Sequence, residues 1–378
     1  MIWFSLLIPI ITIVAMRVFA SRHIVWWEYL LPIAASFVII GAGKLLTETM
    51  QVQDTEYWGG WVSRATYEEP WDERVSCRHA KYRTEYYECG DGKTSRTCSR
   101  QVFEGYEHAY DVDDHPAKWY IEDSNGFTIG ISSARFEWLS QQFNERTFVE
   151  LNRDYHSQDG NAYVAHWDKD WTTLQPVTTV HRYENRVAVS KSIYSYPDVN
   201  PKKSPVYDYP EVNGYDCTSV LSKKRWAGQG EIDKLNAVLG AKKQVRVWVL
   251  LWEDAPRQVG FDQEAYWKGS NKNEIVICVS YKGNEVQWAH VFSWSKSENL
   301  KTAIQSYLAV DNPKLDFRTF APWLQSEVES KWNRRNWKDF DYLTVEPPTW
   351  AVVTLWIITG LVCVGTAYFC IYNGEDLE

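Results

Sequence analysis

The stretch VRVWVLLWEDAPRQVGFDQEAYWKGSNKNEIVICVSY, residues 245–281, decides the fold of this 378-residue chain. It starts with a near-continuous apolar run at 245–252 and ends with a second run at 273–281. Such runs are typical of strands that are buried on both faces of a sheet. Apolar residues at helical spacing precede the stretch at 231–241 and follow it at 297–308. This alternation predicts an α/β unit, which we bound at 229–345.

The polar loop between the two predicted strands is the first candidate binding site. In α/β sheets, ligands bind beyond the carboxyl ends of the strands, where this loop begins. Carboxylates such as Asp254 and Asp262 are the hard oxygen ligands that Ca²⁺ or Mg²⁺ prefers. The alternative is a solvated loop, with Trp267 packed into the core and the asparagines making turn hydrogen bonds. The candidate ligand-binding residues are Asp254, Arg257, Asp262, Trp267, Asn271 and Asn273.

Residues of about 229–310 resemble the TPM domain, a small α/β module that a following helix often tethers to a membrane. The matching parts are VWVLLWED (247–254), QEAYWKG (263–269) and NKNE (271–274). The glycine-rich segment usual after the second strand is absent, and KGNEVQW stands there instead. The resemblance implies metal-assisted chemistry on phosphate esters. No P-loop, nucleophile elbow or HExxH motif accompanies it.

Three apolar segments predict transmembrane helices at 1–20, 24–46 and 350–372. A membrane span needs about 20 apolar residues. The third segment meets this length without any charge, whereas the first two need Arg17 and Lys44 to reach the interface. The whole chain therefore also resembles three-span membrane proteins encoded by phages and bacteria, a class without a defined activity.

The topology follows from the short loop between the first two segments. Arg17, Arg22 and His23 favour a cytoplasmic loop under the positive-inside rule. The soluble region of about 49–346 is then extracytoplasmic. A set of basic residues just before the third segment argues for the opposite orientation. This set comprises Lys331, Arg334, Arg335 and Lys338.

The first part of the soluble region, 49–225, is predicted to be rich in β-strands. We expect EYWGGWVSRATYEE to form strands around a Gly-Gly turn, and residues 132–150 to form a helix that Ser132 caps. The segment RTEYYECGDGKTSRTCSR predicts a hairpin, with GDG at the turn. Together with the C-terminal unit, this makes an α+β membrane protein with a β-rich first part and an α/β second part.

Cys77, Cys89, Cys98 and Cys217 lie in polar surroundings and are the candidates for disulfides. If Cys89 lies near the hairpin turn and faces Thr94, Cys98 is too far away to bond with it. Each would then pair with Cys77 or Cys217. Free thiols are one alternative, and zinc bound by Cys77, His79, Cys89 and Cys98 is the other.

A second metal candidate lies in EHAYDVDDHPAKW, which contains two histidines and three aspartates. We single out Asp113 and His115 within it. The alternative is a polar loop that leads into a strand, because Pro116 forces an extended conformation on His115.

The composition narrows the class of function. A net charge of −9 argues against nucleic-acid binding, and 21 tryptophans fit a membrane-anchored protein with an aromatic-rich outer domain. We expect a multi-pass protein of a bacterial inner membrane or a host membrane. Its role would be structural or interactive, in a cell envelope or a phage. Its partners would be the lipid bilayer and either a protein partner or further copies of the chain, and it would need no cofactor. The alternative is a phosphate-ester ectoenzyme with a divalent cation; the sequence does not decide whether the protein is an enzyme.

Overall fold

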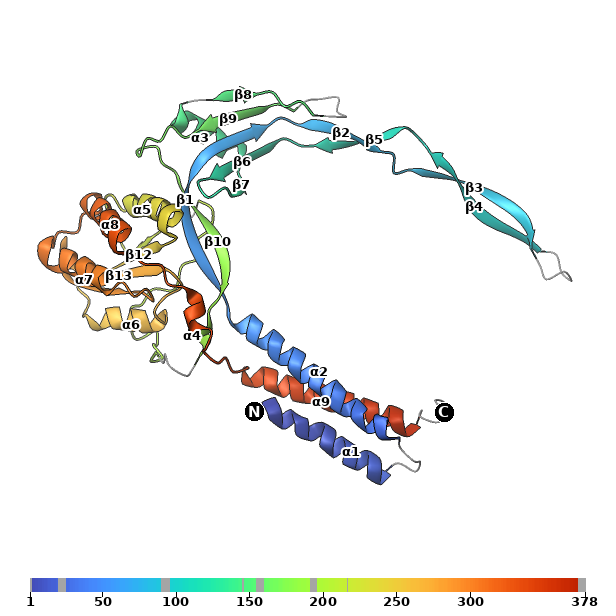
Figure 1. Ribbon diagram of the computed structural model, residues 1–378. Coiled ribbons are helices and arrows are strands. Elements are labelled where there is room, and N and C mark those ends of the chain that lie inside the picture. Colours follow the sequence, from blue (N-terminus) through green and yellow to red (C-terminus); the bar gives the residue numbers. More distant parts are fainter. Residues whose placement is uncertain are drawn as a thin grey trace.

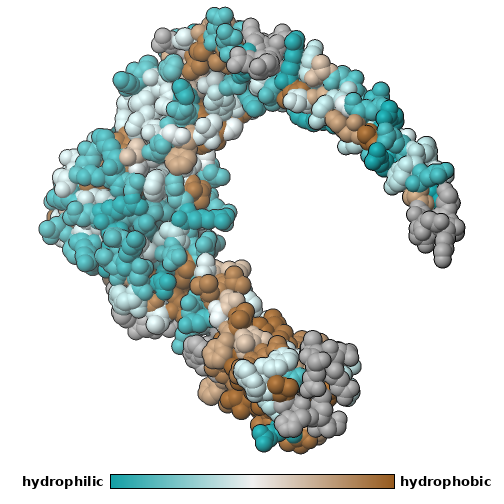
Figure 2. Space-filling model, turned by 45° about the vertical axis from the view of Figure 1, so that its right-hand side comes forward, coloured by the Kyte–Doolittle hydropathy of each residue, from teal (hydrophilic) through white to brown (hydrophobic). Residues whose placement is uncertain are grey.

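The computed structural model has a mixed α and β architecture that forms an open arc (Figure 1). A bundle of apolar helices lies at one end of the arc, a body with two large sheets lies in the middle, and a long two-stranded arm ends at the other side (Figures 1 and 2). The structure describes residues 2–19, 25–89, 96–144, 146–153, 160–190, 196–215 and 217–372.

The helical bundle contains two helices that are long and apolar enough to cross a membrane. These are α2 (Trp26–Gln51) and α9 (Thr349–Tyr372), close to two of the predicted spans. The first predicted span is shorter, because the chain forms a 3₁₀ turn, η1 (Ile2–Leu6), before α1 (Leu7–Phe19). The bundle presents a mostly hydrophobic surface (Figure 2). Arg22, His23 and the tail 373–378 lie outside the described residues.

Small side chains hold α2 and α9 together. The Ser36 hydroxyl lies 3.4 Å from the Cys363 thiol, and both groups are buried. A Cβ added to Gly43 would lie 2.2 Å from a methyl carbon of Leu355, so this position admits only glycine without a shift of that side chain. Close approach at small residues is the usual way for apolar helices to associate where the hydrophobic effect is absent.

Strand β1 (Gln53–Glu68) connects the bundle to the rest of the molecule, because only Val52 separates it from α2. Its first half pairs with β10 (Pro176–Glu184) and its second half with β6 (Lys118–Asp123) and β9 (Ala162–His166). The predicted Gly-Gly turn is wrong: Gly59 and Gly60 lie inside this continuous strand. The sheet is completed by β7 (Thr128–Gly130) and β8 (Thr147–Val149).

The glycines in β1 serve the packing of helix α5 (Gly230–Lys243) against the strand. A Cβ on Gly59 would lie 2.0 Å from the Asn236 carbonyl oxygen, and a Cβ on Gly240 would lie 2.3 Å from the backbone of Gly59. The helix and the strand therefore touch backbone to backbone. A side chain at either glycine would force them apart.

Helix α3 (Ser133–Phe143) covers the sheet around β1. The prediction of a helix is confirmed over this range, but it is wrong for residues 147–149, which form β8. The Ser132 hydroxyl accepts a hydrogen bond from the Arg135 N–H at 3.2 Å, as expected for an N-cap. Its buried face, formed by Phe136, Leu139 and Phe143, packs on the sheet.

The arm is a pair of two-stranded sheets that continue from β1 and β6. In the first sheet β2 (Trp71–Ser76) pairs with β5 (Tyr110–His115), and in the second β3 (Ala80–Cys89) pairs with β4 (Arg96–Tyr106). The second pair, which we call the ribbon, forms the outer end of the arm (Figure 1). The strands of the predicted hairpin are confirmed, and its turn lies outside the described residues.

The α/β unit is built on a four-stranded sheet in the order β11-β12-β13-β14. Strands β11 (Val220–Ser222), β12 (Arg246–Glu253) and β13 (Glu274–Lys282) are parallel, and β14 (Glu285–Phe292) is antiparallel to β13. Alternate residues of β12 enter different cores, with Val247 and Val249 on one face and Trp248 and Leu250 on the other. Burial on both faces explains the two apolar runs that define the unit. The helical elements of this part are α4 (Arg186–Val189), α5, α6 (Gln258–Tyr266), α7 (Glu298–Ser306), the π-helical turn η2 (Tyr307–Asp311), α8 (Phe317–Lys331) and the 3₁₀ turn η3 (Trp337–Phe340).

Candidate functional site

The acidic residues of the predicted binding loop have separate partners. Asp254 is exposed beyond the end of β12, and its carboxylate lies 3.7 Å from the Lys282 ammonium. Asp262, on α6, accepts a hydrogen bond from the Ser204 hydroxyl at 2.7 Å. Arg257 is exposed at the start of α6, with its guanidinium 5.9 Å from the ring centroid of Phe261. Within the described residues, this loop is not part of a cluster of three or more ligand groups close enough to hold one cation.

The other three predicted loop residues face the protein interior. The Trp267 indole donates a hydrogen bond to the Tyr207 carbonyl at 2.8 Å. The Asn271 amide donates to the Thr55 carbonyl, and the Asn273 amide donates to the Glu56 carboxylate, both at 3.0 Å. Asn271 and Asn273 therefore join the α/β unit to β1.

Glu56 is the centre of this junction, and nothing in the sequence singled it out. Its side chain is buried in β1, with Lys272 Nζ 3.2 Å from one carboxylate oxygen and Arg334 Nη2 3.0 Å from the other. Arg334 is one of the basic residues that we interpreted as a topology signal. Here it neutralises a buried charge that lies 278 positions away in the sequence.

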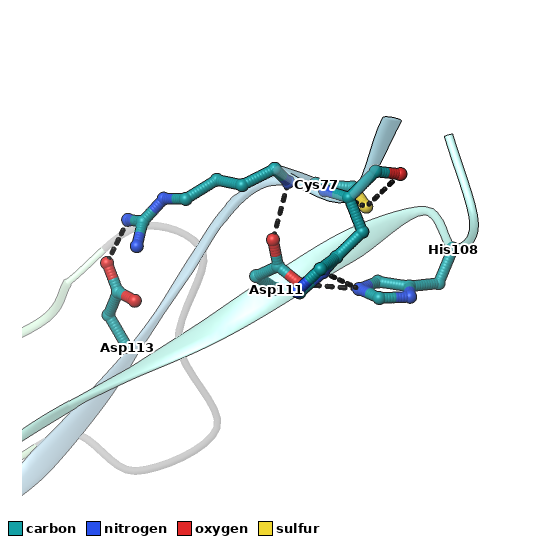
Figure 3. Close-up of polar contacts among 6 residues, drawn as sticks. Cys77, His108, Asp111 and Asp113 are labelled. Carbon is teal, nitrogen blue, oxygen red and sulfur yellow. Dashed lines mark hydrogen bonds and ion pairs between the residues drawn. The ribbon is translucent and has the colours of Figure 1, made fainter. Parts of the chain in front are cut away.

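A junction of a different kind lies in the arm, between the two two-stranded sheets. Cys77 and His79 follow β2, and His108 and Asp111 lie on the returning strand near the start of β5. One potential ligand atom from each of the four residues lies within 4.8 Å of the corresponding atoms of the others. Figure 3 shows Cys77, His108 and Asp111 converging at this place. We call these four residues the junction cluster.

The distances within the junction cluster are short. His79 Nδ1 lies 3.4 Å from His108 Nε2 and 3.1 Å from Asp111 Oδ1, and His108 Nε2 is in direct contact with the same carboxylate oxygen. The Cys77 thiol is buried and accepts the His79 N–H at 3.4 Å. The second oxygen of Asp111 accepts the Arg78 N–H at 2.6 Å, which fixes the orientation of the carboxylate.

The electrostatics of the cluster favour an ionised Asp111. The hydrogen bond from His108, followed by that from the Arg78 N–H and by the nearby His79, lowers the pKa of Asp111 to about 2. The carboxylate is therefore an anion at any physiological pH.

The two earlier metal predictions each supply half of the junction cluster. Cys77 and His79 come from the first, but Cys89 and Cys98 do not join them. Asp113 and His115, singled out in the second, also lie outside the cluster. Asp113 pairs with the Arg78 guanidinium, while His115 lies 3.1 Å from Glu73 and stacks on Trp71.

The predicted disulfide connectivity is wrong, because Cys89 and Cys98 bond to each other across the ribbon. Cys89 faces Arg96 rather than Thr94, and Cys98 faces Tyr87. This register makes the two cysteines diagonal neighbours with their Cα atoms 5.9 Å apart, within the range of a disulfide. Cys217 is remote from them in the sequence, and its thiol accepts a hydrogen bond from Thr178 at 3.4 Å.

The ribbon has one aromatic face and one charged face. Tyr82 pairs with Phe103, and Tyr86 lies on the same side two pleats further along β3. Phe103 also contacts Tyr106 edge-on, with ring centroids 5.3 Å apart. These four rings are all exposed, between 51% and 74% of their surface. The opposite face carries the ion-paired residues Lys81, Arg83, Glu85, Arg100 and Glu104, and one ring, Tyr87, with the Arg100 guanidinium 5.8 Å from its centroid.

A cavity of about 420 Å³ lies where β1, α4 and α6 meet. Its lining includes Thr55, Asn271 and Trp267, which already hold the α/β unit to β1 or to the loop at Tyr207. The cavity therefore borders the contact between β1 and the α/β unit.

No protein-family model, curated protein or solved structure matches the chain. The resemblance to the TPM domain and the phosphate chemistry that it implies therefore stay predictions.

One sequence signal could have found the junction cluster. In the hairpin, Cys89 pairs with Arg96. If this pairing is continued away from the turn, Cys77 lies opposite His108, and the bulge near Lys81 shifts this position by only one residue. Two ligand-rich segments flank the hairpin at equal distance, and the pairing of its strands brings them together. The contacts of Glu56 have no such local signal, because they depend on how two separate units pack.

Proposed function

We propose that the chain is a multi-pass membrane protein that presents the ribbon to a protein partner. The exposed aromatic face of the ribbon carries this proposal. Tyrosine and phenylalanine rings are strong anchors in protein interfaces, and contiguous exposed rings on a soluble surface usually mark a contact site. Phe103 contacts Tyr82 and Tyr106, and all four residues keep more than half of their surface exposed.

The ribbon favours protein over nucleic acid or anionic lipid as the partner. Three of its basic residues, Lys81, Arg83 and Arg100, are ion-paired within the ribbon, so they do not form a free basic stripe of the kind that phosphates need. Within the described residues, β3 and β4 pair only with each other, so each has an open backbone edge. Such edges accept an extended segment of another protein chain as an additional strand. A second copy of this chain is one protein that offers such a segment.

The membrane part of the proposal has three spans, with η1 and α1 as the first. Together they run from Ile2 to Phe19 and lie alongside α2 and α9 (Figure 1). The Cys89–Cys98 disulfide supports an extracytoplasmic location for the soluble region, because disulfides persist in oxidising compartments. The location would be a bacterial inner membrane or a host membrane.

Site-specific photocrosslinking tests the proposed contact surface. A photoreactive phenylalanine analogue replaces Tyr86 on the ribbon in one variant and Tyr342, between η3 and α9, in a control. Both positions are exposed, at 74% and 62%. We expect a protein adduct of defined mass from Tyr86 and none of that mass from Tyr342, in cells that naturally make the protein. Equal yields at both positions, or no adduct at Tyr86, would contradict the proposal.

A further inference from the structure

We propose that the junction cluster of Cys77, His79, His108 and Asp111 is a binding site for a divalent transition metal of the zinc type. The site would fix the base of the ribbon. This inference does not depend on what the ribbon contacts, because it rests only on the geometry of the arm.

The first argument is the spacing of the ligand atoms. In a tetrahedral zinc site with bonds of about 2.0–2.3 Å, neighbouring ligand atoms lie roughly 3.3–3.7 Å apart. The two imidazole nitrogens lie 3.4 Å apart, and His79 Nδ1 lies 3.1 Å from Asp111 Oδ1. A small outward movement of side chains that are partly exposed would admit an ion at the centre.

The second argument is the type and charge of the ligands. One thiol, two imidazoles and one carboxylate form a mixed set of sulfur, nitrogen and oxygen ligands. Zinc binds such mixed sets, whereas calcium and magnesium prefer ligands that are all oxygen. A Cys77 thiolate and the Asp111 carboxylate would together balance the two charges of the ion. Four protein ligands complete a tetrahedral shell, as in structural rather than catalytic sites.

The third argument is the support around the ligands. The Arg78 N–H binds the second oxygen of Asp111 and leaves the first oxygen directed at the histidines. Hydrogen bonds that orient a ligand in this way are a regular feature of metal sites. The side chains of His79 and His108 are 61% and 45% exposed, which gives an ion a path from solvent to the buried Cys77 thiol.

The position of the site gives it a mechanical role. The pairing of β2 with β5 ends at Ser76 opposite Tyr110, and the pairing of β3 with β4 begins at Ala80 opposite Tyr106. Between them, the ladder is interrupted and the arm changes direction (Figure 1). A two-stranded sheet is marginally stable by itself. A metal at the base and the Cys89–Cys98 disulfide near the tip would hold the ribbon at both ends.

Metal binding by the full-length, detergent-solubilised protein tests the inference. After removal of metal with a chelator and titration with Zn²⁺, we expect about one bound equivalent that a Cys77→Ser, His108→Ala variant lacks or binds roughly tenfold or more weakly. Titration with Co²⁺ should produce the absorption of a thiolate-ligated tetrahedral ion in the wild type only. His115→Ala is the matched control, because this nearby histidine lies outside the cluster, and it should bind as the wild type does.

A second measurement needs no variant and so does not depend on whether the variant folds. Zn²⁺ should protect Cys77 from alkylation in the wild-type protein, as read by mass spectrometry, while Mg²⁺ should not. Equal alkylation of Cys77 with and without Zn²⁺ would overturn the inference. Equal zinc binding by the wild type and the double variant, or an equal loss in the His115→Ala control, would also overturn it.

Discussion

The substitution Glu56→Gln should loosen the junction between β1 and the α/β unit. The Glu56 side chain is 4% exposed and has two cationic partners, Lys272 at 3.2 Å and Arg334 at 3.0 Å. Glutamine keeps the size of the side chain and removes its charge. Two cations would then lie against a neutral amide in a largely buried place.

The magnitude follows from the burial of these partners. Removing one member of a buried ion pair costs about 3–5 kcal/mol of unfolding free energy. The Lys272 side chain is 16% exposed and that of Arg334 is 32% exposed, so water partly solvates the arginine after the change. We therefore expect the lower end of this range, about 3 kcal/mol. For a cooperatively unfolding unit of about 150–250 residues, this loss corresponds to a decrease of roughly 6–12 °C in melting temperature.

The assay is thermal unfolding of the detergent-solubilised protein, followed by the fluorescence of its 21 tryptophans. Glu122→Gln is the matched control. It breaks an exposed pair with Arg64, for which less than about 1 kcal/mol is expected. A double-mutant cycle with Arg334→Gln should show positive coupling with Glu56→Gln. Our interpretation of the junction is refuted if Glu56→Gln lowers the melting temperature no more than the control does.

Three further predictions concern other parts of the molecule. Gly240→Ala should destabilise the protein by about 1–3 kcal/mol in the same melting assay, because its Cβ would meet the backbone of Gly59. Gly130→Ala is the control and should change the melting temperature little, because the space around Gly130 is open. Equal effects of the two substitutions would contradict the close packing of α5 on β1. Burial lowers the pKa of His181 below its ordinary 6.5, so the unfolded chain binds the proton first and stability should fall as the pH decreases below 6.5. A His181→Asn variant should lose part of this pH dependence in melting curves, and an unchanged slope would count against it. Cys98→Ser should make the ribbon more sensitive to limited proteolysis while the body stays intact, and a wild-type digestion pattern would show that the disulfide has no role in holding the ribbon.

Local sequence patterns correctly predicted the elements whose buried positions are marked by their own apolar residues. The two apolar runs in 245–281 became β12 and β13 because both faces of this sheet are covered. Helix α3 and its Ser132 cap also follow from neighbouring residues. In these places, the physical cause lies within a few positions of its effect.

Predictions failed where the cause lies far away in the chain. Gly59 and Gly60 have the composition of a turn, but they lie in a strand because α5 packs against them. The disulfide prediction depended on the register of the hairpin. Cys89 pairs with Arg96 and not with Thr94, and this shift of two residues brings Cys98 within bonding distance of Cys89. The carboxylates of the predicted loop remained apart, and the loop's asparagines instead bind β1, which no pattern near residue 270 could show.

The most direct test of the central claim places the photoreactive analogue at Thr84, which lies on the aromatic face between Tyr82 and Tyr86. Adducts are compared between a chain with the four aromatic residues intact and a chain in which serine replaces all four. These residues are Tyr82, Tyr86, Phe103 and Tyr106. A second chain with Phe261→Ser and Tyr342→Ser controls for the loss of exposed rings elsewhere. We predict that the adduct persists in this control and disappears when the four ribbon rings are replaced. An adduct of unchanged mass and yield from the chain without these four rings would contradict the proposal that the aromatic face binds the partner.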